Sequence, residues 1–424
     1  MTPLAQPLYA VVHVRLDGSA PLAPPAAPPG QGQYLVFWWK ELALGHLFVE
    51  PGPRPAAGYH AALQAAVAPA VQHYAPALAR DGAEWPASWS DAGAVARWGA
   101  GLDAALSGWL PPAPPPRVPV SVVVCTRDRA EHLQRCLQML SALACAPAEI
   151  VVVDNAPTDA RTQAVAEEFA GVVYVREPRP GLDIARNTGI RAATSPVVAF
   201  VDDDVLVHPW LLYRVWETFQ DPTTMAMTGL VLALELRTEA QVIFERHWSF
   251  NRGYVDRLYD AAYLRAAPGH APPVWEIGAG ANMAFRKAVF EQVGYFDERL
   301  DVGAAGCSGD SEMWYRILAH GHGIRYNPRA VVHHEHRTEM AALKRQLFYY
   351  MRGHAAAALI QRAHQPRAGY ARHLYWTLPR YYARQLRTGF PFFHSRGRTL
   401  WDELKGLASG VAFYYRNRAP APRP

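Results

Sequence analysis

Three consecutive carboxylates, Asp202, Asp203 and Asp204, directly follow the apolar run 197–201. Adjacent carboxylates at the end of a buried strand repel one another, and a divalent cation with oxygen ligands offsets that repulsion. Mg²⁺ or Mn²⁺ held in this way commonly bridges protein carboxylates to substrate phosphates. A solvated acidic turn is the alternative interpretation, but the buried strand before the triplet favours a cation site.

Two further polar positions stand among apolar residues. Asp154 ends the β-branched run 150–153, where its carboxylate either caps the next helix or accepts hydrogen bonds from a nucleobase or ribose. Arg186 lies in the small-residue segment 181–189. Its planar, permanently charged guanidinium suits a phosphate or a base carbonyl, and a surface helix arginine is the alternative.

The segment CSGDSEMWYRIL, residues 307–318, places Asp310 at the start of an amphipathic helix. A carboxylate there either caps the helix, where the helix dipole favours it, or takes the proton from an attacking hydroxyl. The segment VVHHEHR, residues 331–337, follows another short strand. One of its imidazoles could complete a metal site, and a polar loop with incidental histidines is the alternative.

These residues need a scaffold, and the pattern after residue 119 supplies one, because short apolar runs alternate with amphipathic segments. We predict strands at 120–125, 150–153, 172–175 and 197–201, and helices at 130–144, 159–169 and 183–193. This alternation indicates an α/β fold with a parallel sheet. Ligands bind such sheets at the carboxyl ends of the strands, so we expect Asp154 and Asp202 at one edge.

Proline-rich segments divide the chain. We predict an N-terminal α+β module over 1–110, a linker over 111–118, an α/β domain over 119–340 and a helical extension over 341–424. Consecutive prolines favour an extended linker. Within the first module, 8–16 and 33–50 alternate like strands, and 58–80 and 91–108 are typical of helices. No catalytic constellation is visible in that module.

Composition excludes several classes of protein. The 424 residues carry 42 basic and 37 acidic side chains, which argues against a histone-like or RNA-coating protein. The four cysteines show neither a CxxC pair nor a zinc spacing, so reduced thiols in a cytosol are the simple interpretation. No signal-peptide pattern opens the chain, and the longest uncharged stretch, 55–79, is a poor membrane span. We therefore expect a cytoplasmic protein.

The balance of charge conceals an asymmetry. Residues 341–424 hold 15 basic and 2 acidic side chains, a net +13, while the rest of the chain carries −8. Arginines among paired aromatics suit an anionic membrane interface, single-stranded nucleic acid, or a helical subdomain with its aromatics packed inward. Because the remainder is acidic, no nucleic-acid partner is expected, and peripheral membrane association through 341–424 stays open.

Taken together, the motifs resemble family 2 glycosyltransferases, inverting enzymes with the GT-A fold. The matching stretches, in the family's order over about residues 119–337, are VSVVVCTRDR, EIVVVDNAPTD, GLDIARNTGI, VVAFVDDDV, GAGANMAFR, SGDSEMWYRIL and VVHHEHR. The resemblance implies transfer of a sugar from a nucleotide sugar, with a UDP-sugar favoured, to a hydroxyl of a saccharide or lipid-linked acceptor.

Roles follow from the resemblance position by position. The donor nucleotide would be held by Thr126, Asp154, Arg186, Asp202 and Asp203. The divalent cation, Mg²⁺ or Mn²⁺, would be held by Asp204, Asp202 and His334, with His333 as the alternative to His334. Asp310 matches the catalytic base, and Trp275, Glu312 and Arg316 are candidates for the acceptor side.

One position departs from the family pattern: Gly309 stands before the base, where a Glu is usual. Two other functions remain as alternatives. A sugar nucleotidyltransferase usually shows a Gly-rich loop after its first strand, and CTRDRAEH stands there instead. A catalytically inactive nucleotide-sugar-binding protein would have lost the carboxylates that are present.

Overall fold

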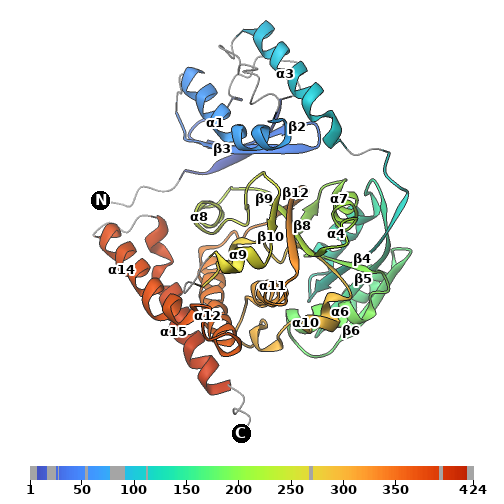
Figure 1. Cartoon of the computed structure of the whole chain (residues 1–424), viewed down its shortest axis with the longest axis vertical. Coiled ribbons are helices and arrows are strands. Elements are labelled where there is room, and N and C mark those ends of the chain that lie inside the picture. The colour runs from blue at the N-terminus through green and yellow to red at the C-terminus, as the bar shows by residue number, and fades with distance from the viewer. Residues whose placement is uncertain are drawn as a thin grey trace.

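A nine-stranded sheet forms the body of the protein, with a smaller three-stranded sheet above it and C-terminal helices along one side (Figure 1). The computed structural model describes residues 7–16, 25–26, 28–52, 56–76, 91–110, 113–266, 271–390 and 395–417. In Figure 1 the α12 and α15 helices lie beside the body, away from the β4–β6 edge.

The large sheet runs in the order β10-β12-β9-β11-β7-β4-β5-β6, and β8 pairs with β12. Its strands are β4 (Arg117–Thr126), β5 (Ala146–Asn155), β6 (Val172–Glu177), β7 (Val197–Val201), β8 (Val205–Val207), β9 (Thr224–Ala233), β10 (Arg257–Tyr259), β11 (Asn282–Arg286) and β12 (Gly323–His334). All neighbours from β6 to β7 are parallel, while β11 runs antiparallel to β7 and β9.

Helices cover both faces of this sheet because its central strands are apolar on both sides. Val122 packs on one face with Leu133 of α4, and Val123 packs on the other with Ile190 of α6. The helices of the body are α4 (Ala130–Ser141), α5 (Arg161–Glu167), α6 (Leu182–Ala192), α7 (Leu211–Thr218), α8 (Glu239–Trp248), α9 (Ala261–Arg265), α10 (Val289–Val293) and α11 (Gly309–Ala319). The predicted α/β architecture is confirmed.

Two segments differ from the sequence-based expectation. His333 and His334 are the last residues of β12 and pair with β8 and β9, so a polar loop does not begin at residue 333. The glycine-rich stretch 278–286, for which no strand was predicted, becomes strand β11 from Asn282. In both cases the partner strands come from elsewhere in the chain, and local composition does not reveal them.

The N-terminal module is α+β, as predicted. It contains β1 (Tyr9–Arg15), β2 (Gly32–Trp39), β3 (Leu42–Val49), α1 (Ala56–Tyr74) and α3 (Ala92–Leu106). Residues 77–80 of the predicted helix 58–80, and residues 111–112 of the predicted linker, lie outside the described residues. All eight residues of β2 are buried, because the module shares one hydrophobic core with residues of β9 and α8, among them Leu232 and Val242.

The C-terminal extension is helical, as predicted. It consists of α12 (Met340–His364), α13 (Tyr370–Arg372), a π-helical turn (His373–Thr377), α14 (Leu378–Gly389) and α15 (Leu400–Asn417). Gly406 and Gly410 let α15 lie against α12, because a Cβ at Gly410 would overlap the Arg352 carbonyl oxygen. Within the described residues, no helix combines the length and apolar character needed to cross a bilayer.

Candidate active site

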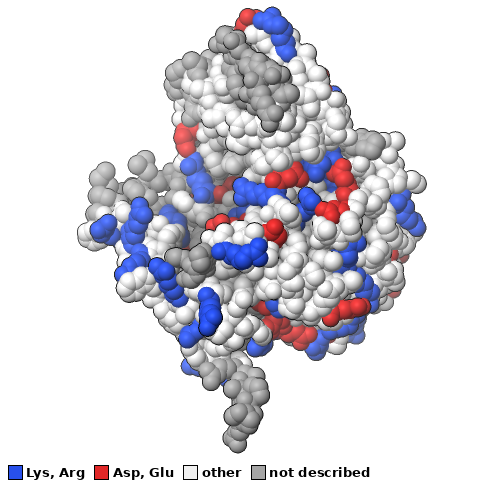
Figure 2. Space-filling view, viewed as in Figure 1, with Lys and Arg blue, Asp and Glu red and all other residues white. Residues whose placement is uncertain are grey.

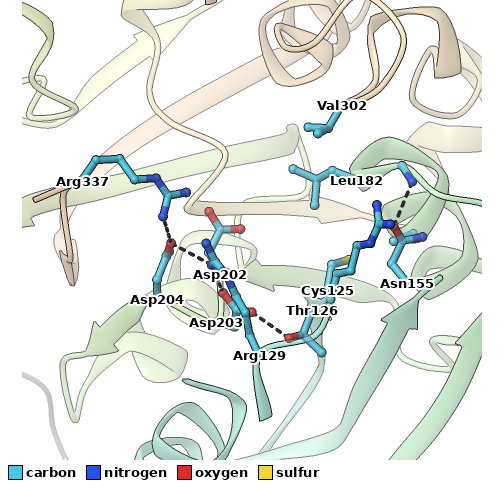
Figure 3. Close-up of a pocket in the computed structure, with 13 residues that line it drawn as sticks. Cys125, Thr126, Arg129, Asn155, Leu182, Asp202, Asp203, Asp204, Val302 and Arg337 are labelled. Atoms are coloured by element: carbon cyan, nitrogen blue, oxygen red, sulfur yellow. Dashed lines mark hydrogen bonds and ion pairs between the residues drawn. The ribbon is translucent and has the colours of Figure 1, made fainter. Parts of the chain in front are cut away.

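An open cavity of about 350 Å³ lies where β4, β5 and β7 end (Figure 3). Register explains why polar residues gather there, because Thr126 and Asp154 are direct partners at the ends of β4 and β5. The cavity is lined by Cys125, Thr126, Arg127, Arg129, Asn155, Gly181, Leu182, Ala185, Asp202, Asp203, Asp204, Val302 and Arg337. The structure therefore gathers Thr126 and the whole Asp triplet in one hollow.

Two carboxylates of the triplet are held by cationic and hydroxyl groups. Asp203 accepts hydrogen bonds from the Thr126 hydroxyl at 2.7 Å and from Arg129 at 2.8 Å. Asp204 accepts a hydrogen bond from the same Arg129 nitrogen at 3.2 Å and lies 3.8 Å from Arg337. In Figure 3, Arg129 reaches across the triplet and Arg337 approaches from the opposite side.

Asp202 is different. Among the contacts of the described residues, its carboxylate has no hydrogen bond and no ion pair. Burial, followed by repulsion from Asp204, raises the pKa of Asp202 to about 7. When Asp202 is ionised, no hydrogen-bonded protein group balances its negative charge. A bound cation would supply positive charge beside it.

His334 lies beside the triplet at the end of β12, with its Nε2 atom 3.6 Å from Asp204 Oδ1. Burial lowers the pKa of His334 to about 3, so the imidazole is neutral at physiological pH. A neutral imidazole and a carboxylate that face each other form a donor set suited to a divalent metal ion.

Asp202, Asp204 and His334 fit a cation whose remaining ligands come from a phosphate-bearing substrate. In the described parts of the chain, no three His, Cys, Asp or Glu side chains already converge as a metal cluster. A site of this kind leaves coordination positions for phosphate oxygens and water, as Mg²⁺ sites in phosphate-binding enzymes commonly do.

Asp154 lies directly behind the cavity wall. Its side chain is fully buried, and Oδ2 accepts a hydrogen bond from the Tyr174 hydroxyl at 2.8 Å. Its Oδ1 atom is buried and has no hydrogen-bond partner among the residues that the structure describes. An unsatisfied buried acceptor costs about 1–3 kcal/mol, so this oxygen is poised for a donor group.

A second charged cluster adjoins the triplet. Arg186 donates a hydrogen bond to Asp183 at 3.0 Å, and both side chains are buried. The Gly280 N–H donates to Asp310 at 3.0 Å. A Cβ at Gly280 would lie 2.7 Å from Arg186 Nη2 and 3.1 Å from Asp310 Oδ2. Gly280 thus lets Arg186 and Asp310 approach one another, although Asp310 is not among the residues that line the cavity.

The unusual Gly309 also has a structural explanation. A Cβ at this position would overlap the Asp183 carboxylate. Asp183 therefore occupies the space that a side chain at position 309 would need, and the buried Asp183 and Arg186 lie next to the half-buried Asp310.

The acceptor-side candidates lie elsewhere. Glu312 accepts hydrogen bonds from Arg316 Nε at 2.8 Å, and Arg316 also binds the backbone carbonyls of Val293 and Tyr295. Trp275 packs against His354 and His373 of the C-terminal extension, with ring centroids 4.9 and 5.1 Å away. None of the three predicted residues lines the cavity.

Several charged residues of the site were missed from the sequence although each stands inside a quoted motif, among them Arg129 in CTRDR, Asp183 in GLDIARN and Arg337 in HHEHR. The only available signal was their place beside residues already singled out. Asn155, which follows Asp154 at the strand end, positions the cavity rim, because it donates to the Arg179 carbonyl and accepts from the Gly181 N–H.

Comparison with known proteins identifies the family of the chain. The sequence model described as "Glycosyltransferase like family 2" matches residues 115–353. The chain belongs to this family. The match covers all the strand-end carboxylates, Asp310 and His334, and the resemblance drawn from the motifs is confirmed.

Individual members of the family are distant in sequence. A pre-mycofactocin glycosyltransferase of Mycobacterium tuberculosis is 28% identical over 268 residues, which are 62% of this chain and 52% of the relative. A glucosyl-dolichyl phosphate glucuronosyltransferase of Haloferax volcanii is 25% identical over 242 residues, which are 52% of this chain and 71% of the relative. The chain thus spans about half the length of the mycobacterial relative.

Among solved structures, a mannosyltransferase from Pyrobaculum calidifontis is 20% identical to this chain. The superposition covers 70% of this chain and 89% of the mannosyltransferase, with a TM-score of 0.49.

Proposed function

We propose that this family 2 glycosyltransferase transfers a sugar from a nucleotide sugar to an acceptor hydroxyl with inversion at the anomeric carbon. The observation that carries the proposal is the arrangement of carboxylates at one end of the sheet. The Asp triplet lines the cavity, and the charge of Asp310 raises the pKa of Asp202 after burial and nearer charges. The side of the site that would bind the cation therefore adjoins the side that carries Asp310, the proposed general base.

The donor nucleotide, for which we favour a UDP-sugar, would bind across the ends of β4 and β5. Thr126 and Asn155 line the cavity there, and the unpartnered Oδ1 of Asp154 lies just behind. A uracil or ribose offers the N–H or O–H donor that this oxygen lacks. Arg186 adds a guanidinium suited to the phosphates or the base.

Asp202, Asp204 and His334 would hold the divalent cation, and we favour Mn²⁺ over Mg²⁺ because an imidazole nitrogen is among the ligands. When bound, the cation offsets the charge that develops on the leaving nucleoside diphosphate. Arg129 and Arg337, which already approach Asp204, place further positive charge at the cavity rim.

Asp310 would act as the general base. The acceptor oxygen forms the new bond to the anomeric carbon while its proton passes to the Asp310 carboxylate. The bond from the anomeric carbon to the diphosphate oxygen breaks, and the electron pair leaves with the diphosphate. Attack opposite to the leaving group inverts the anomeric centre, and general-base assistance contributes about 10²–10⁴-fold.

Replacement of the base tests the proposal. The full chain is screened with a panel of nucleotide sugars and Mn²⁺ for transfer or hydrolysis. We expect Asp310→Asn to lower turnover at least 100-fold and to leave the dissociation constant of the nucleoside diphosphate, measured by calorimetry, within about threefold. Asp402→Asn in α15 is the control for loss of one carboxylate. Equal loss of nucleotide binding and turnover in Asp310→Asn would contradict the base role.

The same screen separates the alternatives. A sugar nucleotidyltransferase would release no nucleoside diphosphate from a nucleotide sugar, and with pyrophosphate added it would form a nucleoside triphosphate and a sugar 1-phosphate. An inactive binding protein would bind a nucleotide sugar without consuming it.

We further propose that the acceptor is a saccharide or a lipid-linked saccharide, reached at the cytoplasmic face of a membrane. Figure 2 shows basic side chains gathered over the C-terminal extension. Trp376 of the π-helical turn and Arg380, Arg384 and Arg387 of α14 form an exposed stripe, and the opposite face of α14 buries Tyr382. Arginines beside an exposed aromatic suit an anionic bilayer surface.

A further inference from the structure

A line of buried side chains connects the N-terminal module to the cation side of the cavity. Tyr34 of β2 donates to Glu245 of α8 at 3.1 Å, and Glu245 contacts His336 Nε2 at 2.9 Å. His336 Nδ1 lies 3.0 Å from His334 Nδ1, and His334 Nε2 faces Asp204. The contacts cross from residue 34 to residue 204 without an exposed side chain.

We propose that Tyr34, Glu245 and His336 are positioning residues for the cation site, so that the N-terminal module takes part in metal binding. The proposal rests on the proposed function only in assigning His334 as a ligand. It gives a role to a module in which the sequence shows no chemistry.

The donor and acceptor roles along this line depend on the tautomers of the two histidines, and a neutral His336 gives them one direction. A tyrosine hydroxyl beside a carboxylate donates, and the second Glu245 oxygen accepts the proton of His336 Nε2. In a neutral His336 the Nδ1 atom then carries the lone pair, so it accepts from His334 Nδ1–H. His334 is left with its lone pair on Nε2, the atom that faces Asp204.

This tautomer is the one that a metal ligand requires. The opposite tautomer would place a proton on Nε2 and block coordination. Hydrogen bonds to the second ring nitrogen commonly set both the tautomer and the ring orientation of a metal-binding histidine, and their loss costs about 10–100-fold in metal affinity.

Packing holds the line of residues in place. Phe244 and Phe250 lie against His336, with ring centroids 4.6 and 6.3 Å away. On the module side, Phe48 and His46 of β3 pack against the Tyr34 ring at 4.7 and 5.2 Å. Tyr34 therefore cannot leave Glu245 without disturbing the sheet that carries it.

Binding of Mn²⁺ to the full chain, measured by electron paramagnetic resonance with and without UDP, tests the inference. We expect Glu245→Gln to weaken Mn²⁺ binding about 10–100-fold and Tyr34→Phe about 3–10-fold, because the Ser249 hydroxyl, 3.0 Å away, still donates to Glu245. Tyr59→Phe is the matched control, since Tyr59 is a fully buried tyrosine of the same module whose hydroxyl has no hydrogen-bond partner in the described parts of the chain. It should leave Mn²⁺ affinity unchanged.

The outcomes are distinct when thermal unfolding shows all variants to be folded. Weaker Mn²⁺ binding by Tyr34→Phe than by Tyr59→Phe supports the inference. Equal Mn²⁺ affinities of these two variants overturn the inference, even if Glu245→Gln binds Mn²⁺ weakly. The N-terminal module would then contribute only packing to the body. If the wild-type chain binds no Mn²⁺ under either condition, the cation site of the proposed function fails, and the inference fails with it.

Discussion

Asp183 and Arg186 form a buried ion pair that balances only part of the negative charge around the proposed base. Asp301 and Asp310 lie close enough to oppose ionisation of Asp183, and burial raises its pKa most, so that it reaches about 7. Buried carboxylates with raised pKa values are common in catalytic sites, because the site is built for charge that arrives with the substrate.

The raised pKa of Asp183 predicts a dependence of stability on pH. Its ordinary value is 3.8, so the folded protein binds this proton more tightly than the unfolded chain between pH 4 and 7. The free energy of unfolding should therefore fall as pH rises through this window, by up to about 1.4 kcal/mol per pH unit from this group, and level off above pH 7. Asp183→Asn should lack this component in denaturant titrations made without metal.

Asp159→Asn is the control for this measurement. The Asp159 carboxylate is exposed, and a hydrogen bond from the Arg161 N–H lowers its pKa. Its contribution is lost only as pH falls below the ordinary range of a carboxylate, so this variant should parallel the wild type from pH 4.5 to 8. The same slope in Asp183→Asn and wild type would show that Asp183 does not titrate in this window.

At the scale of elements, the sheet decides which loops form the cavity. Parallel pairing brings the ends of β4, β5 and β7 together, and α6 begins beside them at Leu182. The antiparallel β11 returns the chain from this edge, and Gly280, just before it, contacts Asp310. Asp310 is therefore positioned by the start of α11, which carries it, and by the residues just before β11, which contact it.

The close contact between α12 and α15 predicts that a side chain added at Gly410 lowers the stability of the protein. A side chain at Gly410 would meet the Arg352 carbonyl and the Ala355 side chain, so Gly410→Val should force α15 away from α12. We expect a loss of about 1–3 kcal/mol in the free energy of unfolding and faster limited proteolysis after residue 390. Ala408→Val, on the exposed side of the same helix, should change neither.

At the scale of the whole molecule, three parts share their packing. The N-terminal module continues into the core of the body. The C-terminal extension packs on α8 through Leu343 and Leu347. Glu245 of α8, a helix of the body, binds Tyr34 of the N-terminal module on one side and His336 of the body on the other. The body thus contacts both additions near the cation side of the cavity.

Membrane association is a prediction for the whole chain. Full-length protein should float with vesicles that contain anionic lipid and remain unbound with neutral vesicles. Arg380→Gln, Arg384→Gln and Arg387→Gln together should weaken binding at least tenfold, because each basic residue near an anionic surface contributes about 1 kcal/mol.

A variant with equal loss of charge is the control for this prediction. Glutamine replaces Arg135, Arg161 and Arg257, three exposed arginines of the body, and should leave vesicle binding intact. Equal weakening by both variants would indicate attraction by net charge without a defined surface on α14.

The sequence by itself determined the α/β body and the strand-end carboxylates. Periodicity and apolar runs record which face of an element is buried. The motifs predicted Asp154 and Asp202 at the ends of strands and Asp310 at the start of a helix. The family assignment drawn from these motifs was confirmed.

Only the tertiary structure decided which side chains meet. Arg129 pairs with Asp203 across 74 residues, and Tyr34 reaches Glu245 across 211 residues. Asp183 fills the space beside Gly309. Local patterns encode burial but not partners, because a partner is set by strand order and by the angle at which helices lie on the sheet.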